Sequence, residues 1–223
     1  MSFADDAIEI ETGARCDAAV IWLHGLGADG HDFEPIVPEL RLPGSLAARF
    51  VFPHAPMRPV TLNGGMRMRA WYDIISLDGK REEDAAGIRA SQSLVEGLVA
   101  REVARGIPVR RIVLAGFSQG GVIALQTGLR HPARLAGIMA LSTYVPLAAT
   151  LAAERSPANG DLPIFMAHGT QDPTIGMDKG AASRDILAAL GYPVEWHTYP
   201  MPHSVCAQEI ADVSAWLTRT ALA

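Results

Sequence analysis

Residues 111–121 read RIVLAGFSQGG, and the chain continues as VIALQTGLR to position 130. The apolar run at 111–115 predicts a buried strand, and the apolar residues after position 121 recur with helical spacing. Between them lies the pentapeptide GFSQG at 116–120, a G-x-S-x-G pattern. In a sharp turn between a strand and a helix, this pattern holds its serine in a strained conformation with the hydroxyl exposed at the positive end of the helix. We therefore predict that Ser118 is a nucleophile.

Short apolar runs recur along the rest of the chain and alternate with helical patterns. The runs lie at 18–23, 49–52, 135–141, 163–167 and 194–199, and the helical patterns at 82–105, 119–130, 179–190 and 206–217. Runs that are apolar throughout suit strands buried on both faces of a parallel sheet. The alternation predicts an α/β fold, a mostly parallel central sheet flanked by helices. In such folds the active site lies at the carboxyl ends of the strands.

A serine hydroxyl needs a general base to accept its proton, and the chain has seven histidines. In the chain order Ser, Asp, His the base comes late, in a loop after the last strand. His203 meets this condition, because it lies between the run at 194–199 and the final helical pattern. His197 lies inside a predicted strand, while His131 and His168 end a helix and a strand. We expect structural roles for these three.

An acidic residue must orient the histidine and stabilise its charged form. Asp172 follows the predicted strand 163–167 in the sequence HGTQDP. Asp161 lies at the opposite end of that strand, and Asp178 lies where an acidic residue caps a helix. We therefore predict Asp172 as the third member of the group. The alternative for Asp172 is a turn aspartate before Pro173.

An oxyanion formed during acyl transfer is stabilised by two backbone N–H groups, and losing one such donor typically lowers kcat about 10²–10³-fold. The residue after the nucleophile, Gln119, supplies one donor, and a loop after an earlier strand supplies the other. HGLG at 24–27 is the glycine-rich loop in that position. We predict the N–H of Leu26 as the second donor, with Gly27 as the alternative. For the His24 side chain we expect a structural hydrogen bond.

Composition argues against several other functions. The formal net charge is −5 and the pI about 5.8, without the basic clusters that nucleic-acid binding needs. Two cysteines are too few for a disulfide framework or a cysteine-rich metal site, and we expect no metal and no cofactor. No run approaches the roughly 18 apolar residues that span a bilayer, so we expect no integral membrane association. Residues 1–13 are acidic and lack the apolar core of a secretory signal, which favours a cytoplasmic location.

Further segments between about residues 18 and 216 carry a family pattern. They are HGLG at 24–27, FPHAP at 52–56, NGG at 63–65, WYD at 71–73, GFSQGG at 116–121, HG at 168–169 with DP at 172–173, and His203. In these segments the chain resembles the phospholipase/carboxylesterase family of α/β hydrolases, which includes bacterial carboxylesterases and acyl-protein thioesterases. The resemblance implies an α/β-hydrolase fold, a triad of Ser118, Asp172 and His203, and oxyanion donors from Leu26 and Gln119. It departs after Asp-Pro, where relatives usually carry a pair such as Val-Val and this chain has Thr174-Ile175. The change could reshape the pocket wall beside the acid.

The predicted reaction is two-step acyl transfer by a serine carboxylesterase acting on short- to medium-chain esters. About twenty residues separate the runs at 135–141 and 163–167, too few for a separate cap domain. We therefore predict a single α/β-hydrolase domain over residues 1–223, with an open site walled by loops. The segment 53–71 is the predicted acyl-binding wall, with Met66, Met68 and Trp71 as substrate contacts. Methionines fill protein cores equally often, so packing is the alternative for this segment.

Other functions stay open at this point. A thioesterase acting on S-acylated proteins or small thioesters would use the same residues. A lysophospholipase would do so too, with an exposed apolar rim. A catalytically silent binding module, which a serine-directed fluorophosphonate would leave unlabelled, belongs to a different class. Cys206 lacks a tight turn and an acid of its own, so we expect a structural thiol. Because relatives in this family can form dimers, a homodimer is a further prediction.

Overall fold

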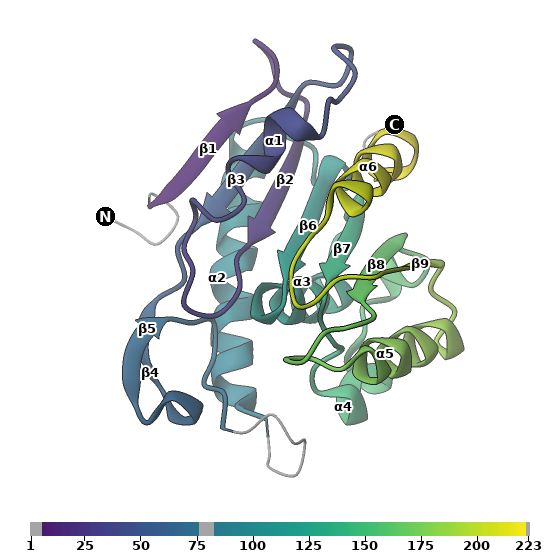
Figure 1. Cartoon of the computed structure of the whole chain (residues 1–223). Coiled ribbons are helices and arrows are strands. Elements are labelled where there is room, and N and C mark those ends of the chain that lie inside the picture. The colour runs from purple at the N-terminus through teal and green to yellow at the C-terminus, as the bar shows by residue number, and fades with distance from the viewer. Residues whose placement is uncertain (1–5, 76–82, 222–223) are drawn as a thin grey trace.

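A computed structural model of the chain describes residues 6–75 and 83–221, and its centre is a seven-stranded sheet (Figure 1). The strands lie in the order β1-β3-β2-β6-β7-β8-β9. Their bounds are Ala7–Glu11 for β1, Ala18–Leu23 for β2, Ala48–Pro53 for β3, Ile112–Phe117 for β6, Gly137–Leu141 for β7, Ile164–Gly169 for β8 and Val194–Tyr199 for β9. Every neighbouring pair is parallel except β1 with β3. The carboxyl ends of the six parallel strands therefore meet at one edge of the sheet.

The inner strands form because their sequences are apolar on both faces. All residues of β2, β7 and β8 are buried, as are the first five of β6. Such strands are stable only where helices cover both faces of the sheet. Burial at β1 alternates instead, because this strand lies at the edge and pairs on one side only.

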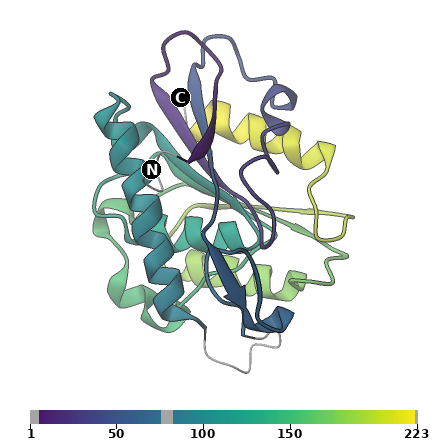
Figure 2. The ribbon, with the colours of Figure 1, turned by 90° about the vertical axis from the view of Figure 1, so that its left-hand side faces the viewer.

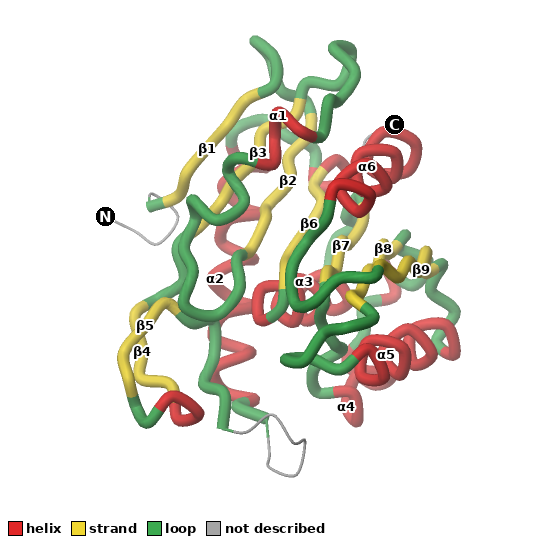
Figure 3. Tube along the Cα trace, in the orientation of Figure 1, coloured by secondary structure: helices red, strands yellow, loops and turns green. Residues whose placement is uncertain are grey.

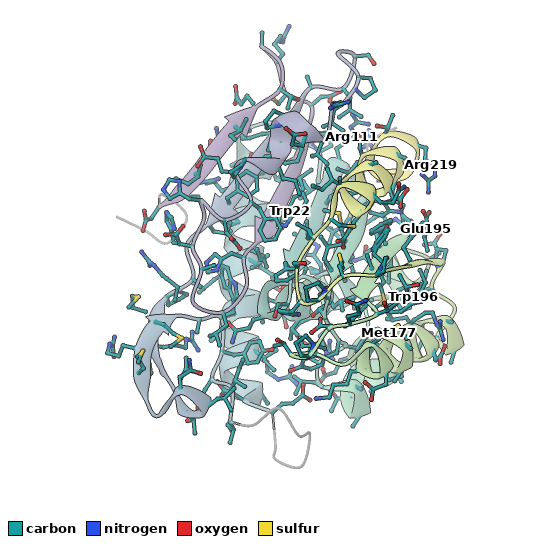
Figure 4. The ribbon with its side chains drawn as sticks, viewed as in Figure 1. Trp22, Arg111, Met177, Glu195, Trp196 and Arg219 are labelled. Carbon is teal, nitrogen blue, oxygen red and sulfur yellow. The ribbon has the colours of Figure 1, made fainter. Side chains whose placement is uncertain are left out.

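Helices cover the two faces unequally (Figures 1 and 2). One face packs against α2 (Ala85–Ala104), α3 (Gln119–Arg130), α4 (Ala148–Glu154) and α5 (Met177–Ala189). The other face packs against α1 (Ile36–Glu39) and α6 (Ala207–Trp216). Trp22, which projects from β2 into this second face, stacks on Phe33 at a ring-centroid distance of 5.2 Å (Figure 4). An ion pair between Glu195 on β9 and Arg219 ties the C-terminal segment to the sheet edge.

The structure contains the mostly parallel sheet and the flanking helices that the sequence predicted (Figure 3). The predicted helix at 82–105 is α2, which begins at Ala85, and residue 82 lies outside the described residues. The structure adds β1, α1 and α4, which the sequence analysis did not anticipate. These elements are short or only half-buried, so they lack a continuous apolar run. No described helix has both the length and the hydropathy to cross a membrane.

The segment 53–71 contains regular secondary structure and is not only a loop. It contains an antiparallel hairpin of β4 (Met57–Val60) and β5 (Met66–Arg69), in which Met57 pairs with Arg69 and Val60 with Met66. Two glycines with φ of 65° and 80°, Gly64 and Gly65, form its turn, since other residues avoid this left-handed region. Among the described residues, this hairpin is the only sheet outside the central one, and no separate cap domain covers the carboxyl edge.

Glu209, in the first turn of α6, is fully buried. Burial raises the pKa of its carboxyl from 4.5 to about 8, and the nearby Asp212 adds to the rise. Between pH 4.5 and about pH 8, the Glu209 carboxyl is ionised in the unfolded chain and protonated in the folded chain. This group therefore stabilises the fold fully only below about pH 4.5, and its contribution is lost as the pH rises toward 8.

We expect Glu209→Gln to remove this dependence, because a carboxamide mimics the protonated acid in shape. The free energy of unfolding of the variant, relative to the wild type, should rise between pH 5 and 8 by roughly 3–5 kcal/mol. Urea unfolding at several pH values measures this difference. Glu96→Gln, at a half-buried position on α2, is the control for the substitution itself. A difference between Glu209→Gln and wild type that is constant across pH would contradict the prediction.

Candidate active site

Ser118 lies where β6 ends and α3 begins. Its φ of 54° and ψ of −120° form a conformation that costs a non-glycine residue roughly 1–3 kcal/mol. Two hydrogen bonds hold it there. The N–H of Ser118 donates to the carbonyl of Leu141 at 2.9 Å, and the carbonyl of Ser118 accepts from the hydroxyl of Thr143 at 2.7 Å. The carboxyl end of β7 thus anchors the strained turn.

Close backbone approach explains the two glycines of the G-x-S-x-G pattern. A Cβ atom at Gly120 would lie 2.2 Å from the carbonyl oxygen of Leu23, and one at Gly116 would lie 2.3 Å from the carbonyl carbon of Gly120. Backbone atoms cannot move away as a flexible side chain can. Only glycine lets β2, β6 and α3 meet at this point, and this meeting presents Ser118 at the edge of the sheet.

The structure brings His203 and Asp172 to Ser118 from two other strand ends. His203 follows β9, and its Nε2 lies 2.9 Å from the Oγ of Ser118. Its Nδ1 lies 2.6 Å from Oδ2 of Asp172, which follows β8. The Phe117 ring packs against the imidazole at a centroid distance of 4.7 Å. Hydroxyl, imidazole and carboxylate are therefore aligned in the geometry that lets a histidine take a proton from a serine.

Asp172 is held by the two residues at which the chain departs from the pattern of the family that it resembles. Its Oδ1 accepts hydrogen bonds from the backbone N–H groups of Thr174 and Ile175, at 2.8 and 2.9 Å. The carbonyl of Ile175 in turn lies 2.8 Å from Nε2 of His168, which is fully buried. Because these contacts use the backbone of Thr174 and Ile175, the unusual side chains leave the carboxylate in place. Asp161 pairs with Arg134, and Asp178 lies in the first turn of α5 after the N-cap Gly176.

Two backbone N–H groups are placed for an oxyanion. Gln119 is the first residue of α3, and the first N–H groups of a helix have no acceptor within the helix. Leu26 lies in the loop after β2 and lines the same cavity as Ser118 and Gln119. The N–H of Gly27 already donates to the carbonyl of Arg69 at 2.9 Å. This favours Leu26 over Gly27 as the second donor.

The side chain of Gln119 has a separate task. Its Oε1 accepts from the N–H of Trp71 and its Nε2 donates to the carbonyl of Tyr72, both at 2.7 Å. The amide therefore fixes residues 71 and 72 against the start of α3. This use of a buried carboxamide accounts for glutamine directly after the nucleophile.

His24 is neutral and structural in this arrangement. Its Nε2 accepts from the N–H of Ala55 at 3.0 Å, so its hydrogen lies on Nδ1, which donates to the carbonyl of Gly25 at 2.7 Å. Burial lowers the pKa of His24 to about 4. The indole N–H of Trp71 donates to the His24 carbonyl at 2.9 Å. The loop that carries Leu26 is thus fixed on both sides.

A cavity of about 960 Å³ opens beside Ser118. Its walls come from the loops after β2, β4, β5, β7, β8 and β9 and from the turn at Ser118. Much of the lining is apolar or aromatic, with Leu62, Tyr72, Ile74, Tyr144, Val145, Leu147 and Ile175. Asp73, Glu83, Asp84 and Lys179 also line it. This volume is at the upper end of the roughly 300–1,000 Å³ of pockets that bury a drug-sized ligand.

The three residues predicted to contact substrate do not line this cavity. The Trp71 side chain is fully buried beneath the loop after β2, where it holds the His24 carbonyl. Met66 is 65% exposed on the hairpin, and the sulfur of Met68 lies 3.8 Å from the amide nitrogen of Asn63. Of the predicted wall at 53–71, the cavity uses only Leu62.

The principal lining residues are not among those predicted to contact substrate, although the sequence carries one signal for them. Tyr144, Val145 and Leu147 follow β7, the strand between those that carry Ser118 and Asp172. Their position at the carboxyl edge predicts a place near the site. Residues 72–75 directly follow the tryptophan of the WYD motif, and two of them, Tyr72 and Ile74, line the cavity. Within residues 6–75 and 83–221, no group of three or more His, Cys, Asp or Glu could hold a metal ion.

Comparison with known proteins identifies the family of the chain. The model of the phospholipase/carboxylesterase family matches residues 5–221. The chain belongs to this family. Acyl-protein thioesterase 1 of Neurospora crassa is 44% identical over 214 residues, which cover 92% of this chain and 87% of that protein.

Two solved structures agree with this chain in fold. Arabidopsis thaliana SOBER1 superposes with a TM-score of 0.85 at 30% identity, covering 91% of this chain and 98% of that one. Acyl-protein thioesterase 2 of Zea mays also superposes with a TM-score of 0.85, at 29% identity and over 95% and 97% of the two chains. The predicted α/β-hydrolase fold is confirmed, and the protein is a hydrolase.

Proposed function

We propose that the protein is a thioesterase that hydrolyses acyl thioesters through an acyl-enzyme on Ser118, acting as a single domain. The observation that carries the proposal is the alignment of Ser118, His203 and Asp172 at the mouth of a cavity of about 960 Å³ with a largely apolar lining. Relatives at 40–44% identity are named acyl-protein thioesterase 1. They favour the thioesterase alternative over the short- to medium-chain esterase of the sequence analysis.

The first half-reaction acylates the serine. His203 Nε2 takes the hydroxyl proton while Ser118 Oγ attacks the thioester carbonyl carbon. The N–H groups of Leu26 and Gln119 bind the oxyanion that forms. Asp172 accepts from Nδ1–H of His203 and stabilises the imidazolium. Collapse of the tetrahedral intermediate breaks the carbon–sulfur bond, and Nε2–H of His203 protonates the departing thiolate.

The second half-reaction repeats these steps with water as the nucleophile. His203 accepts a proton from the water, whose oxygen bonds to the acyl carbon, and then returns a proton to Ser118 Oγ as the acid leaves. The same two backbone donors bind the second oxyanion. No group outside this chain and the two reactants takes part in either half-reaction.

The large cavity accommodates the acyl chain, which gives the proposal a direct test. Each methylene transferred from water to an apolar wall contributes about 0.8 kcal/mol. We expect kcat/KM to rise with chain length from butanoyl toward dodecanoyl or hexadecanoyl thioesters, and to exceed that of matched oxygen esters. A spectrophotometric thiol assay with matched thioester and ester series measures both trends. Faster hydrolysis of short oxygen esters would return the protein to the carboxylesterase class, and inertness with a fluorophosphonate would indicate the silent binding module.

We expect Ile74→Trp to shorten the acyl chain that the enzyme accepts. Ile74 is half-buried and lines the cavity, so an indole there would occupy the space of several methylenes. The kcat/KM for a hexadecanoyl thioester should fall about 10–50-fold, while that for a butanoyl thioester changes little. Val103→Trp, at an exposed position on α2 outside the cavity, is the control. Equal losses at all chain lengths would exclude Ile74 from the acyl wall.

A further inference from the structure

A second cavity is also lined by His203, and its other walls come from α1, α6 and the loops beside them. We call it the α1–α6 cavity. Its volume is about 480 Å³. Its apolar lining comes from Phe33, Pro35 and Ile36 on one side and from Val205 and Ile210 on the other. Neither half-reaction described above assigns it a role.

The α1–α6 cavity adjoins the proposed active site. It shares Asp32, Phe117 and His203 with the large cavity. Ser118, Leu26 and Gln119, which would hold the acyl carbon and its oxygen, line only the large cavity. The leaving group must instead lie at Nε2 of His203, since that atom delivers its proton. A leaving group that extends past the imidazole therefore enters the α1–α6 cavity.

The charges of the α1–α6 cavity have one sign. Asp32 and Glu39 line it, and no Lys or Arg does. Neither carboxylate forms an ion pair with another described residue, whereas the adjacent Glu34 is paired with His31. Burial beside the wall raises the pKa of Asp32, with Asp29 adding to the rise. A cation placed in this cavity would meet two unpaired carboxylates beside an apolar surface.

We propose that the α1–α6 cavity binds the leaving group of a cationic substrate, an S-acylated peptide with Lys or Arg beside the acylated cysteine. The apolar lining fits the aliphatic stem of such a side chain, and the carboxylates fit its charged end. The inference rests on the proposed thioesterase function and specifies the substrate class of that same site.

Three short peptides test the proposal. Each carries one S-octanoyl cysteine, flanked on both sides by Lys, by Gln or by Glu. The wild type should show kcat/KM in the order Lys, Gln, Glu, with the Lys peptide about three- to tenfold above the Gln peptide at low ionic strength. The ratio should shrink in 0.5 M salt, because the carboxylates are exposed.

Variants of the cavity carboxylates give the second readout. Asp32→Asn with Glu39→Gln should bring the Lys-to-Gln ratio of kcat/KM to within about twofold of unity, and Glu39→Lys should place the Glu peptide above the Lys peptide. Asp185→Asn is the matched control. It removes one carboxylate from α5, outside both cavities, and should keep the wild-type ratio.

The failure of this inference is distinguishable from the failure of the proposed function. Equal kcat/KM for the three peptides in the wild type, or a Lys preference that survives in the Asp32→Asn, Glu39→Gln variant, would overturn the inference and leave the thioesterase intact. A lysophosphatidylcholine hydrolysed faster than every peptide would identify a lipid headgroup as the cation and also overturn it. No hydrolysis of any thioester would overturn both proposals.

Discussion

Ser118→Ala is expected to lower kcat/KM for thioesters about 10⁵–10⁶-fold, because it removes the hydroxyl that lies 2.9 Å from His203 Nε2. The residual rate would come from the oxyanion donors and the bound geometry alone. Alanine removes the hydroxyl without adding bulk, and the strained φ of 54° belongs to the turn rather than to the hydroxyl. We therefore expect the variant to fold with the wild-type circular dichroism and a similar midpoint in urea.

Two controls make this prediction sharp. A fluorophosphonate should label the wild type once and leave Ser118→Ala unlabelled. Ser204→Ala, which removes a hydroxyl one residue from His203 in the α1–α6 cavity, should still be labelled. Labelling of Ser118→Ala, or a loss in kcat/KM below about 100-fold, would show that another residue is the nucleophile.

The residues of the proposed triad could be predicted from the sequence because each follows a strand of the parallel sheet. The strands before Ser118 and Asp172 are buried and largely apolar, whereas β9, before His203, is a partly buried edge strand. Parallel strands place all their carboxyl ends at one edge, so Ser118, Asp172 and His203 converge whatever the loops between them do. The glycines at 116 and 120 add a second signal, since a Cβ at Gly116 would meet the backbone of Gly120 and one at Gly120 would meet the backbone of Leu23 on β2. Local sequence and global topology here give the same answer.

The substrate-contacting wall could not be predicted in the same way. The composition of the segment 53–71 predicts Met66, Met68 and Trp71 as substrate contacts, but composition does not reveal which side of a hairpin faces a cavity. Trp71 faces inward because Gln119 binds its backbone and the His24 carbonyl binds its indole, contacts that join residues more than 45 positions apart. Long-range contacts of this kind leave no local pattern. The strand β1 was not predicted either. Its apolar residues alternate with exposed glutamates, so it lacks the continuous apolar run of the inner strands.

Asp172→Asn is expected to lower kcat about 10⁴-fold while leaving the fold intact. The two oxygens of Asp172 have different partners: Oδ1 accepts from two backbone N–H groups, and Oδ2 accepts from His203. An asparagine must keep its carbonyl oxygen at the first position, since an amide nitrogen cannot accept there. Its NH₂ group then faces Nδ1 of His203 and donates to it.

This donation would force the histidine hydrogen onto Nε2, the atom that must accept the proton of Ser118. The imidazole would stay in place with the wrong tautomer, so kcat should fall far more than KM changes. Stopped-flow and steady-state thioester assays measure the split, and the ¹⁵N chemical shifts of His203 report the tautomer directly. His203→Ala combined with Asp172→Asn should cost little more than His203→Ala alone, because the carboxylate acts through the imidazole. A loss below about tenfold in the single variant, or additive losses in the double variant, would show that Asp172 acts independently of His203.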